Sequence, residues 1–149
     1  MRIVAQRVSR AKATVDGRVT GEIGPGLMIL LGVGKEDTAQ VAAAMAEKAA
    51  NLRIFEDEQG KMNLSLLDVK GSALVVSQFT LYGDARGQRR PSYISAAPPE
   101  LAKRLYEEFS EALRKLGVFV GNGIFQAMMS VELVNEGPVT ILIDSGKTF

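Results

Sequence analysis

The sequence predicts a single α+β domain over residues 1–149, with a largely antiparallel β-sheet, a barrel-like core and two main helices. About seven or eight segments have the alternating or continuously apolar pattern of strands, whereas only two have helical periodicity. Two of the links between strands are short enough for hairpins, which join antiparallel strands. A chain of 149 residues fits one domain, and no internal repeat or linker divides it.

The first half of the chain predicts four strands followed by one helix. Asp16-Gly17 suits the two positive-φ positions of a type I′ turn and is flanked by β-branched residues, so it predicts a hairpin. Asp37 or Thr38 can cap a helix over residues 39–52, where apolar residues recur at helical spacing. The predicted strands are residues 2–8, 13–15, 18–20 and 27–31, the last of them an interior strand.

The second half predicts one long amphipathic helix among further strands. Residues 56–61 are polar and contain a glycine, which suits an exposed loop or hairpin turn. Pro98-Pro99 opens the helix and Gly117 ends it, because proline is tolerated in a first turn and glycine is favoured just after a last one. The predicted strands are residues 73–76, running on into 77–81, and then 118–125, 128–134 and 139–143.

The stretch Asn135-Glu136-Gly137-Pro138-Val139-Thr140 separates the last two predicted strands. Gly137 can adopt backbone angles closed to other residues, while Pro138 fixes its own φ and donates no hydrogen bond. The peptide bond between them is one of the few that can be cis without a large penalty. Local chemistry predicts a hairpin turn. The alternative is a backbone element placed against a ligand.

The composition excludes several kinds of chemistry. The chain has no cysteine and no histidine, which excludes Ser–His–Asp and Cys–His catalysis and thiolate or imidazole zinc sites. We therefore expect no metal and no cofactor. No apolar run approaches the ~20 residues of a membrane span, and the first residues lack the pattern of a signal peptide, so we expect a cytoplasmic protein with no membrane contact. A formal net charge of +1 leaves room for a local basic face.

Polar residues stand where the strand beginning at residue 73 should end. Ser77-Gln78-Phe79-Thr80 places two hydroxyls and an amide around an aromatic ring. In a strand, Ser77 and Phe79 would point to one side and Gln78 and Thr80 to the other. Such residues could present hydrogen-bond donors to a bound carbonyl, as in an oxyanion hole. The alternative is a solvated strand end, and Thr80 without a base is a poor nucleophile.

Two sets of arginines are candidate contacts. Arg86, Arg89 and Arg90 lie in a loop-like segment near Tyr93, where they could contact phosphates while bases stack on the aromatic ring. The alternative is that these side chains are simply solvated. Arg7 lies on an otherwise apolar strand, where its guanidinium could hold a backbone carbonyl or could face water at the rim.

Ser77-Gln78-Phe79-Thr80-Leu81, combined with the stretch from Asn135 to Thr140, resembles the D-aminoacyl-tRNA deacylase family. The resemblance spans essentially the whole chain. It also includes Met1–Val8, Arg90-Pro91-Ser92-Tyr93 and Gly123–Phe125. Either short motif alone is moderate evidence, whereas both together, at this spacing in a chain of this length, are highly specific.

The resemblance implies a homodimeric enzyme that hydrolyses the ester between a D-amino acid and the terminal adenosine of tRNA. It also implies activity on glycine mischarged onto tRNA(Ala). A cis Gly137–Pro138 peptide, oriented by Arg7, would insert into the active site of the other subunit, occupy the space of an L side chain and grip the substrate's amino group. Ser77 to Thr80 would form the opposite wall, where main-chain N–H groups and the Thr80 hydroxyl meet the ester. Phe125 and Met129 would line the adenosine pocket.

With no protein base available, such an enzyme would rely on positioning, on oxyanion stabilisation and on the ribose 2′-hydroxyl of its substrate. A covalent role for Thr80 is the alternative within the family. The chain departs from the family pattern at Gln126 and Met128, where members carry Gly and Asp, and more mildly at Glu136 for Asp and Tyr93 for Phe.

Two other classes of function remain open on the sequence. A non-catalytic RNA-binding module would depend mainly on Arg86, Arg89 and Arg90, and would need Gly137 and Pro138 only for folding. A small-molecule-binding structural dimer is the second. The enzyme hypothesis instead predicts D-selective release of amino acids from tRNA.

Overall fold

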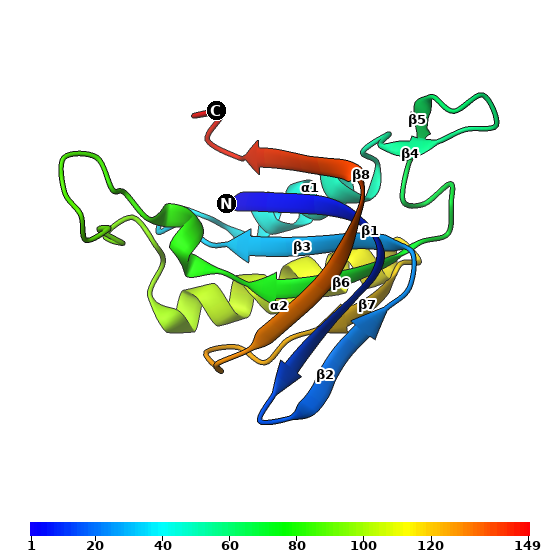
Figure 1. The fold of residues 1–149 in the computed structure, drawn as a ribbon. Coiled ribbons are helices and arrows are strands. Elements are labelled where there is room, and N and C mark those ends of the chain that lie inside the picture. The colour runs from blue at the N-terminus through cyan, green and yellow to red at the C-terminus, as the bar shows by residue number, and fades with distance from the viewer.

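The computed structural model describes residues 1–149. It contains a mixed β-sheet, and both α-helices cover the same face of that sheet (Figure 1). The strand order is β2-β1-β3-β6-β7, and β8 pairs with the outer side of β1. The strands are β1 (Arg2–Val15), β2 (Arg18–Ile23), β3 (Gly26–Gly32), β4 (Phe55–Glu56), β5 (Met62–Leu64), β6 (Ser72–Ser77), β7 (Phe119–Asn122) and β8 (Ser130–Asp144). The helices are α1 (Ala39–Ala50), α2 (Pro99–Lys115) and the short 3₁₀ helix η1 (Phe79–Tyr82).

The predicted fold class is confirmed. The pairings of β1 with β2, β3 and β8 are antiparallel, whereas β3–β6 and β6–β7 are parallel. The two ends of the sheet, β2 and β7, approach each other closely. A Cβ added to Gly21 of β2 would lie only 2.6 Å from the carbonyl oxygen of Asn122 in β7. The absence of a side chain at Gly21 therefore lets β2 lie against β7 and gives the sheet its barrel-like curvature.

Several local predictions are also confirmed. Asp16 and Gly17 have φ angles of 48° and 76° and join β1 to β2, as expected for a type I′ hairpin. Thr38, rather than Asp37, caps α1, since its hydroxyl accepts a hydrogen bond from the Val41 amide. Residues 56–61 belong to the small β4–β5 hairpin.

Several predicted strand boundaries are wrong. β1 runs without a break through residues that we expected to separate two strands, because both halves find partners: β3 pairs with residues 2–8 and β2 with residues 11–15. β7 is shorter than predicted. β8 is one strand rather than two strands joined by a hairpin, because both parts of it pair antiparallel with β1 and the chain never reverses at Gly137–Pro138.

The main core lies between the helices and the sheet. Leu105, Phe109 and Leu113 of α2 are fully buried, in agreement with the predicted amphipathic helix. Each such side chain contributes about 1.5–3 kcal/mol through the apolar surface it removes from water. Leu116 is 39% exposed because it lies just past the end of α2. Neither helix is long and apolar enough to cross a membrane.

Candidate active site

A cavity of about 820 Å³, here called the Thr80 cavity, gathers the predicted catalytic residues and the predicted adenosine-binding residues. Ser77, Gln78, Phe79 and Thr80 form one part of its lining, and the segment from Phe125 to Met129 forms another. The remaining lining residues are Val33, Val76, Tyr93, Ala96, Ala97, Pro99, Ala102 and Val131. The structure therefore brings the predicted catalytic residues and the predicted adenosine-binding residues into one site.

The backbone turns sharply where β6 meets this cavity. Ser77 is the last residue of β6, the Gln78 amide still donates to Leu31 of β3 at 2.8 Å, and η1 follows at once. The predicted strand-like alternation over residues 77–80 is therefore wrong beyond Ser77. The first N–H groups of a helix have no intrahelical acceptor, so the amides of Phe79 and Thr80 are free to bind a ligand.

The hydroxyl of Thr80 has a defined hydrogen-bonding role. The side-chain amide of Gln78 donates a hydrogen bond to Thr80 Oγ1, and Thr80 itself is exposed. A hydroxyl oxygen that already accepts one bond still has its own hydrogen to donate. Thr80 can therefore donate to an oxygen atom in the cavity.

The Thr80 cavity contains no charged side chain. All 17 of its lining residues are neutral, and 12 of them are hydrophobic. A substrate bound here meets hydroxyl, amide and apolar side chains, and no carboxylate, lysine or arginine.

The wall from Phe125 to Met129 is held by contacts behind it. Tyr106 of α2 donates a hydrogen bond to the Val75 carbonyl oxygen at 2.9 Å, and its ring lies 6.2 Å from that of Phe125. A Cβ on Gly123 would lie 2.5 Å from the sulfur of Met129, so glycine at this position allows Met129 to lie close. The wall is thus supported by both β6 and α2.

Gln126 and Met128 are the larger of the departures from the pattern that the resemblance implies, and both line the Thr80 cavity. Gln126 has φ of 63°, a left-handed conformation that favours glycine. The glycine that the resemblance implies at this position would suit this backbone conformation. Met128 is 90% exposed and lies at the rim.

Several residues line the cavity that the sequence had not assigned to this site. Tyr93 lies edge-on against Phe79, with ring centroids 5.1 Å apart, and both are partly exposed. Residues 96–102 contribute because α2 begins beside the cavity. Their pattern predicted only a helix start, and nothing in their residue types indicated a binding wall.

Gly137 and Pro138 lie elsewhere, in a bulge of β8. Gln6 pairs with Thr140 and Val8 pairs with Asn135, so the four residues 136–139 lie opposite Arg7 alone. We call this segment the 136–139 bulge. The Gly137–Pro138 peptide bond is cis, and both residues are exposed. The predicted hairpin turn is wrong here because the extra residues are looped out of a continuing strand.

Two residues fasten the 136–139 bulge to the sheet. The side-chain oxygen of Asn135 accepts a hydrogen bond from the Val139 amide at 2.9 Å, and its amide nitrogen donates to the Thr140 hydroxyl at 3.0 Å. Arg7 donates from Nε to the Glu136 carbonyl oxygen at 3.0 Å. The bulge is therefore closed at its base and held from β1.

Arg7 is buried, with 8% of its surface exposed, so the rim alternative is wrong. Its Nη1 donates to the Ile54 carbonyl oxygen at 2.7 Å, and its Nη2 lies 3.7 Å from Glu56. Arg7 thus connects the bulge to the β4–β5 hairpin. A separate cavity of about 380 Å³ lies here, lined by Arg7, Phe55, Glu56, Val69, Glu136 and Gly137, and shares no residue with the Thr80 cavity.

The three arginines of the basic loop differ in their environment. Arg86 donates to both carboxylate oxygens of Asp84, at 2.9 and 2.7 Å, and these hydrogen bonds hold the pKa of Asp84 well below its usual range. Arg89 and Arg90 are exposed and form no salt bridge. The charge of Arg86 is therefore largely compensated, whereas those of Arg89 and Arg90 remain available.

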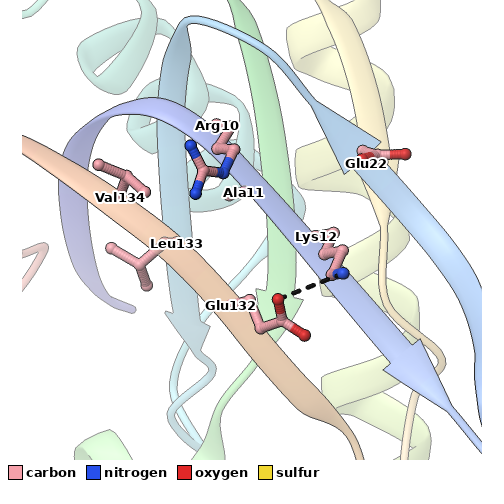
Figure 2. A pocket seen from close by; sticks show the side chains of 7 residues that line it. All are labelled: Arg10, Ala11, Lys12, Glu22, Glu132, Leu133 and Val134. Atoms are coloured by element: carbon pink, nitrogen blue, oxygen red, sulfur yellow. Dashed lines mark ion pairs between the residues drawn. The ribbon is translucent and has the colours of Figure 1, made fainter.

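A smaller cavity of about 160 Å³ lies between β1, β2 and β8 (Figure 2). Lys12 and Glu132 are cross-strand neighbours there, 3.2 Å apart, and both are partly exposed. A surface pair of this kind contributes little to stability. The structure contains no group of three or more acidic, cysteine or histidine residues placed to hold a metal ion.

The comparisons with known proteins agree on one family. The family model described as D-Tyr-tRNA(Tyr) deacylase matches residues 4–144. The chain is 60% identical to a D-aminoacyl-tRNA deacylase of Fervidobacterium nodosum, with all of both chains covered. It is 63% identical to one of Roseiflexus castenholzii, covering 97% of this chain and 92% of that one.

A solved structure also matches. The protein described as c-Myc DNA Unwinding Element Binding Protein has a TM-score of 0.91 and 42% sequence identity, covering 97% of this chain and 99% of that one. The fold, the sequence motifs and the relatives agree. The chain therefore belongs to the D-Tyr-tRNA(Tyr) deacylase family and is a hydrolase of that family.

Proposed function

We propose that this protein hydrolyses the ester bond of D-aminoacyl-tRNA and of glycyl-tRNA(Ala), releasing the free amino acid and tRNA. One observation carries the proposal: Ser77–Thr80 and Phe125–Met129 line the same cavity. The first segment suits a scissile ester, and the second offers an aromatic ring and a thioether to an adenine base. A cavity of about 820 Å³ also lies within the range of small-molecule sites.

Catalysis in this proposal rests on the backbone and the substrate. The free amides of Phe79 and Thr80 stabilise the oxyanion that forms when the ester carbonyl is attacked. The Thr80 hydroxyl, which accepts from Gln78, donates a further hydrogen bond. The cavity lacks any charged side chain, so the neighbouring ribose 2′-hydroxyl activates water or assists the attack.

Chiral selection is assigned to Gly137 and Pro138 of a partner subunit in a homodimer. The 136–139 bulge is exposed and its cavity is separate from the Thr80 cavity, which fits a segment that acts on another copy of the chain. Backbone atoms at this position would leave no room for an L side chain while binding the substrate's amino group. A wall that works by exclusion admits glycine as well as D residues.

Two groups of arginines support this arrangement. Arg7 orients the 136–139 bulge through its hydrogen bond to the Glu136 carbonyl oxygen. Arg89 and Arg90 contact the phosphates of the tRNA backbone, and Arg86 contributes less because Asp84 compensates its charge.

The deciding experiment offers the purified protein tRNA charged with D-Tyr, L-Tyr or Gly and measures ester release under single-turnover conditions. We expect rapid release of D-Tyr, release of Gly from tRNA(Ala), and at least ~10²-fold slower release of L-Tyr, because its side chain meets a rigid backbone wall. Substrate ending in 2′-deoxyadenosine should be inert. Equal rates for D- and L-Tyr would contradict the proposal, and tRNA binding without hydrolysis would favour an RNA-binding module.

A further inference from the structure

Arg2, the first residue of β1, contacts the turn that carries Thr80. Its Nη1 donates a hydrogen bond to the Leu81 carbonyl oxygen at 2.9 Å. Its guanidinium carbon lies 4.6 Å from the centroid of the Tyr82 ring, a cation–π distance. Leu81 and Tyr82 directly follow Thr80 and complete η1. Arg2 therefore holds the end of η1 by a charged hydrogen bond and by an aromatic contact.

Two glycines allow η1 to pack directly against the end of β3. A Cβ on Gly32 would lie 3.1 Å from the Gln78 carbonyl oxygen, and a Cβ on Gly34 would lie 2.6 Å from the Tyr82 hydroxyl. Gly32 is also the residue that pairs with Arg2 across the β1–β3 ladder. Arg2 therefore lies beside the part of β3 on which η1 packs. Because its partner Gly32 has no side chain, the Arg2 side chain can reach Leu81.

The position of the Arg2 guanidinium leaves one of its donors unpaired. Its Nε is buried and has no hydrogen-bond partner. Buried donors are nearly always satisfied, so this exception calls for an explanation. The position that leaves Nε unpaired is the one in which Nη1 bonds Leu81 while the planar group covers the ring of Tyr82.

We propose that Arg2 is a positioning residue for the reaction: by holding Leu81 and Tyr82, it sets the direction of the Phe79 and Thr80 amides at the Thr80 cavity. The inference rests on the proposed function, in which these amides stabilise the oxyanion. A hydrogen bond with a charged donor is about twice as strong as a neutral one. A misplacement of about 1 Å at a catalytic group can lower a rate by ~10²-fold.

The test compares Arg2→Met, Arg2→Lys and the wild type in single-turnover hydrolysis of D-Tyr-tRNA over a range of enzyme concentrations. We expect Arg2→Met to lower the maximal rate constant by about 10- to 100-fold, with less than about a threefold change in the concentration giving half of that rate. Arg2→Lys should recover much of the loss, because an ammonium can still donate to Leu81. Arg18→Met, at an exposed position of β2, is the matched control and should behave as wild type.

Hydrogen exchange provides a readout that does not depend on activity. In Arg2→Met the amides of residues 79–83 should exchange faster while those of α1 remain unchanged. The inference is overturned if Arg2→Met keeps the wild-type maximal rate, if it weakens only tRNA binding, or if exchange rises equally in α1. If the wild type releases no D-Tyr, the proposed function fails, and the exchange measurement still decides whether Arg2 holds η1.

Discussion

The Thr80 cavity and the 136–139 bulge differ in how many segments of the chain form them. The cavity is enclosed by segments from β6, η1, the start of α2 and the wall at 125–129, each packed on the core. The bulge rises from β8, which pairs only with β1 and leaves its other edge free. The cavity is lined by several segments of one chain, whereas the bulge is a single exposed segment that Arg7 holds at its base.

This difference has a consequence for how substitutions act. Residues of the Thr80 cavity touch the substrate in our proposal, and the groups that matter most there are backbone amides, which a side-chain substitution does not remove. Residues of the 136–139 bulge act through shape, which a single added atom can change. We therefore expect the largest effects in the bulge and smaller effects in the cavity.

The largest effect is expected for Gly137→Ala. Gly137 has φ of 127°, and an added Cβ would lie 2.9 Å from Val139 Cγ2 and 3.0 Å from Arg7 Nη2. The bulge must shift, at a cost of about 1–3 kcal/mol in unfolding free energy. We expect D-Tyr-tRNA hydrolysis to fall about 100-fold, measured in single turnover. Gly24→Ala is the control, since a Cβ there meets nothing within 4 Å. A folded Gly137→Ala protein with the wild-type rate and chiral preference would show that the reaction does not depend on the shape of the bulge.

A smaller effect is expected for Thr80→Val in the cavity. The substitution keeps the shape of the side chain and removes one hydroxyl, while the amide of residue 80 remains. Loss of one hydrogen bond should slow single-turnover hydrolysis by roughly 3- to 10-fold. Thr80→Ser, which keeps the hydroxyl, should be close to wild type. A loss on the order of 10⁴-fold in Thr80→Val alone would instead support Thr80 as a covalent nucleophile.

The smallest effect is expected for Gln126→Gly at the rim of the cavity. Gln126 has a left-handed backbone conformation, which costs a residue with a side chain about 1–2 kcal/mol. Glycine removes this cost, but it also increases the conformational entropy of the unfolded chain, which offsets part of the stabilisation. The unfolding free energy should rise by about 0.5–1 kcal/mol in urea titration. Ala127→Gly, with no positive φ to relieve, should lower it by about 0.5–1 kcal/mol. A loss of stability in Gln126→Gly would contradict this reading of the backbone.

The sequence predicted those parts of the fold that local chemistry decides. Asp16-Gly17 strongly favours a type I′ turn between two strands. Thr38 is a favourable N-cap just before an alanine-rich segment. The motif from Ser77 to Thr80 also proved to line a cavity. In each case the signal and its structural result lie within a few residues of each other.

The misses occur where the outcome depends on a distant strand. Gly137-Pro138 has the composition of a turn, but β1 offers partners on both sides of it, so the chain loops out and continues. Residues 96–102 become a cavity wall only because α2 begins beside η1. Arg2 likewise gained its contact with Leu81 from the β1–β3 register, which a single sequence does not reveal.

The looped-out form of the 136–139 bulge also matters for how this part of the chain can evolve. In an ordinary strand, insertion or deletion of one residue turns every following side chain to the opposite face. Here the ladder ends at Asn135 and restarts at Thr140, each anchored separately on β1. A change of length between these two points is absorbed before it reaches either ladder. The length of the segment proposed to select the chirality of the substrate can therefore change without shifting the register of the sheet.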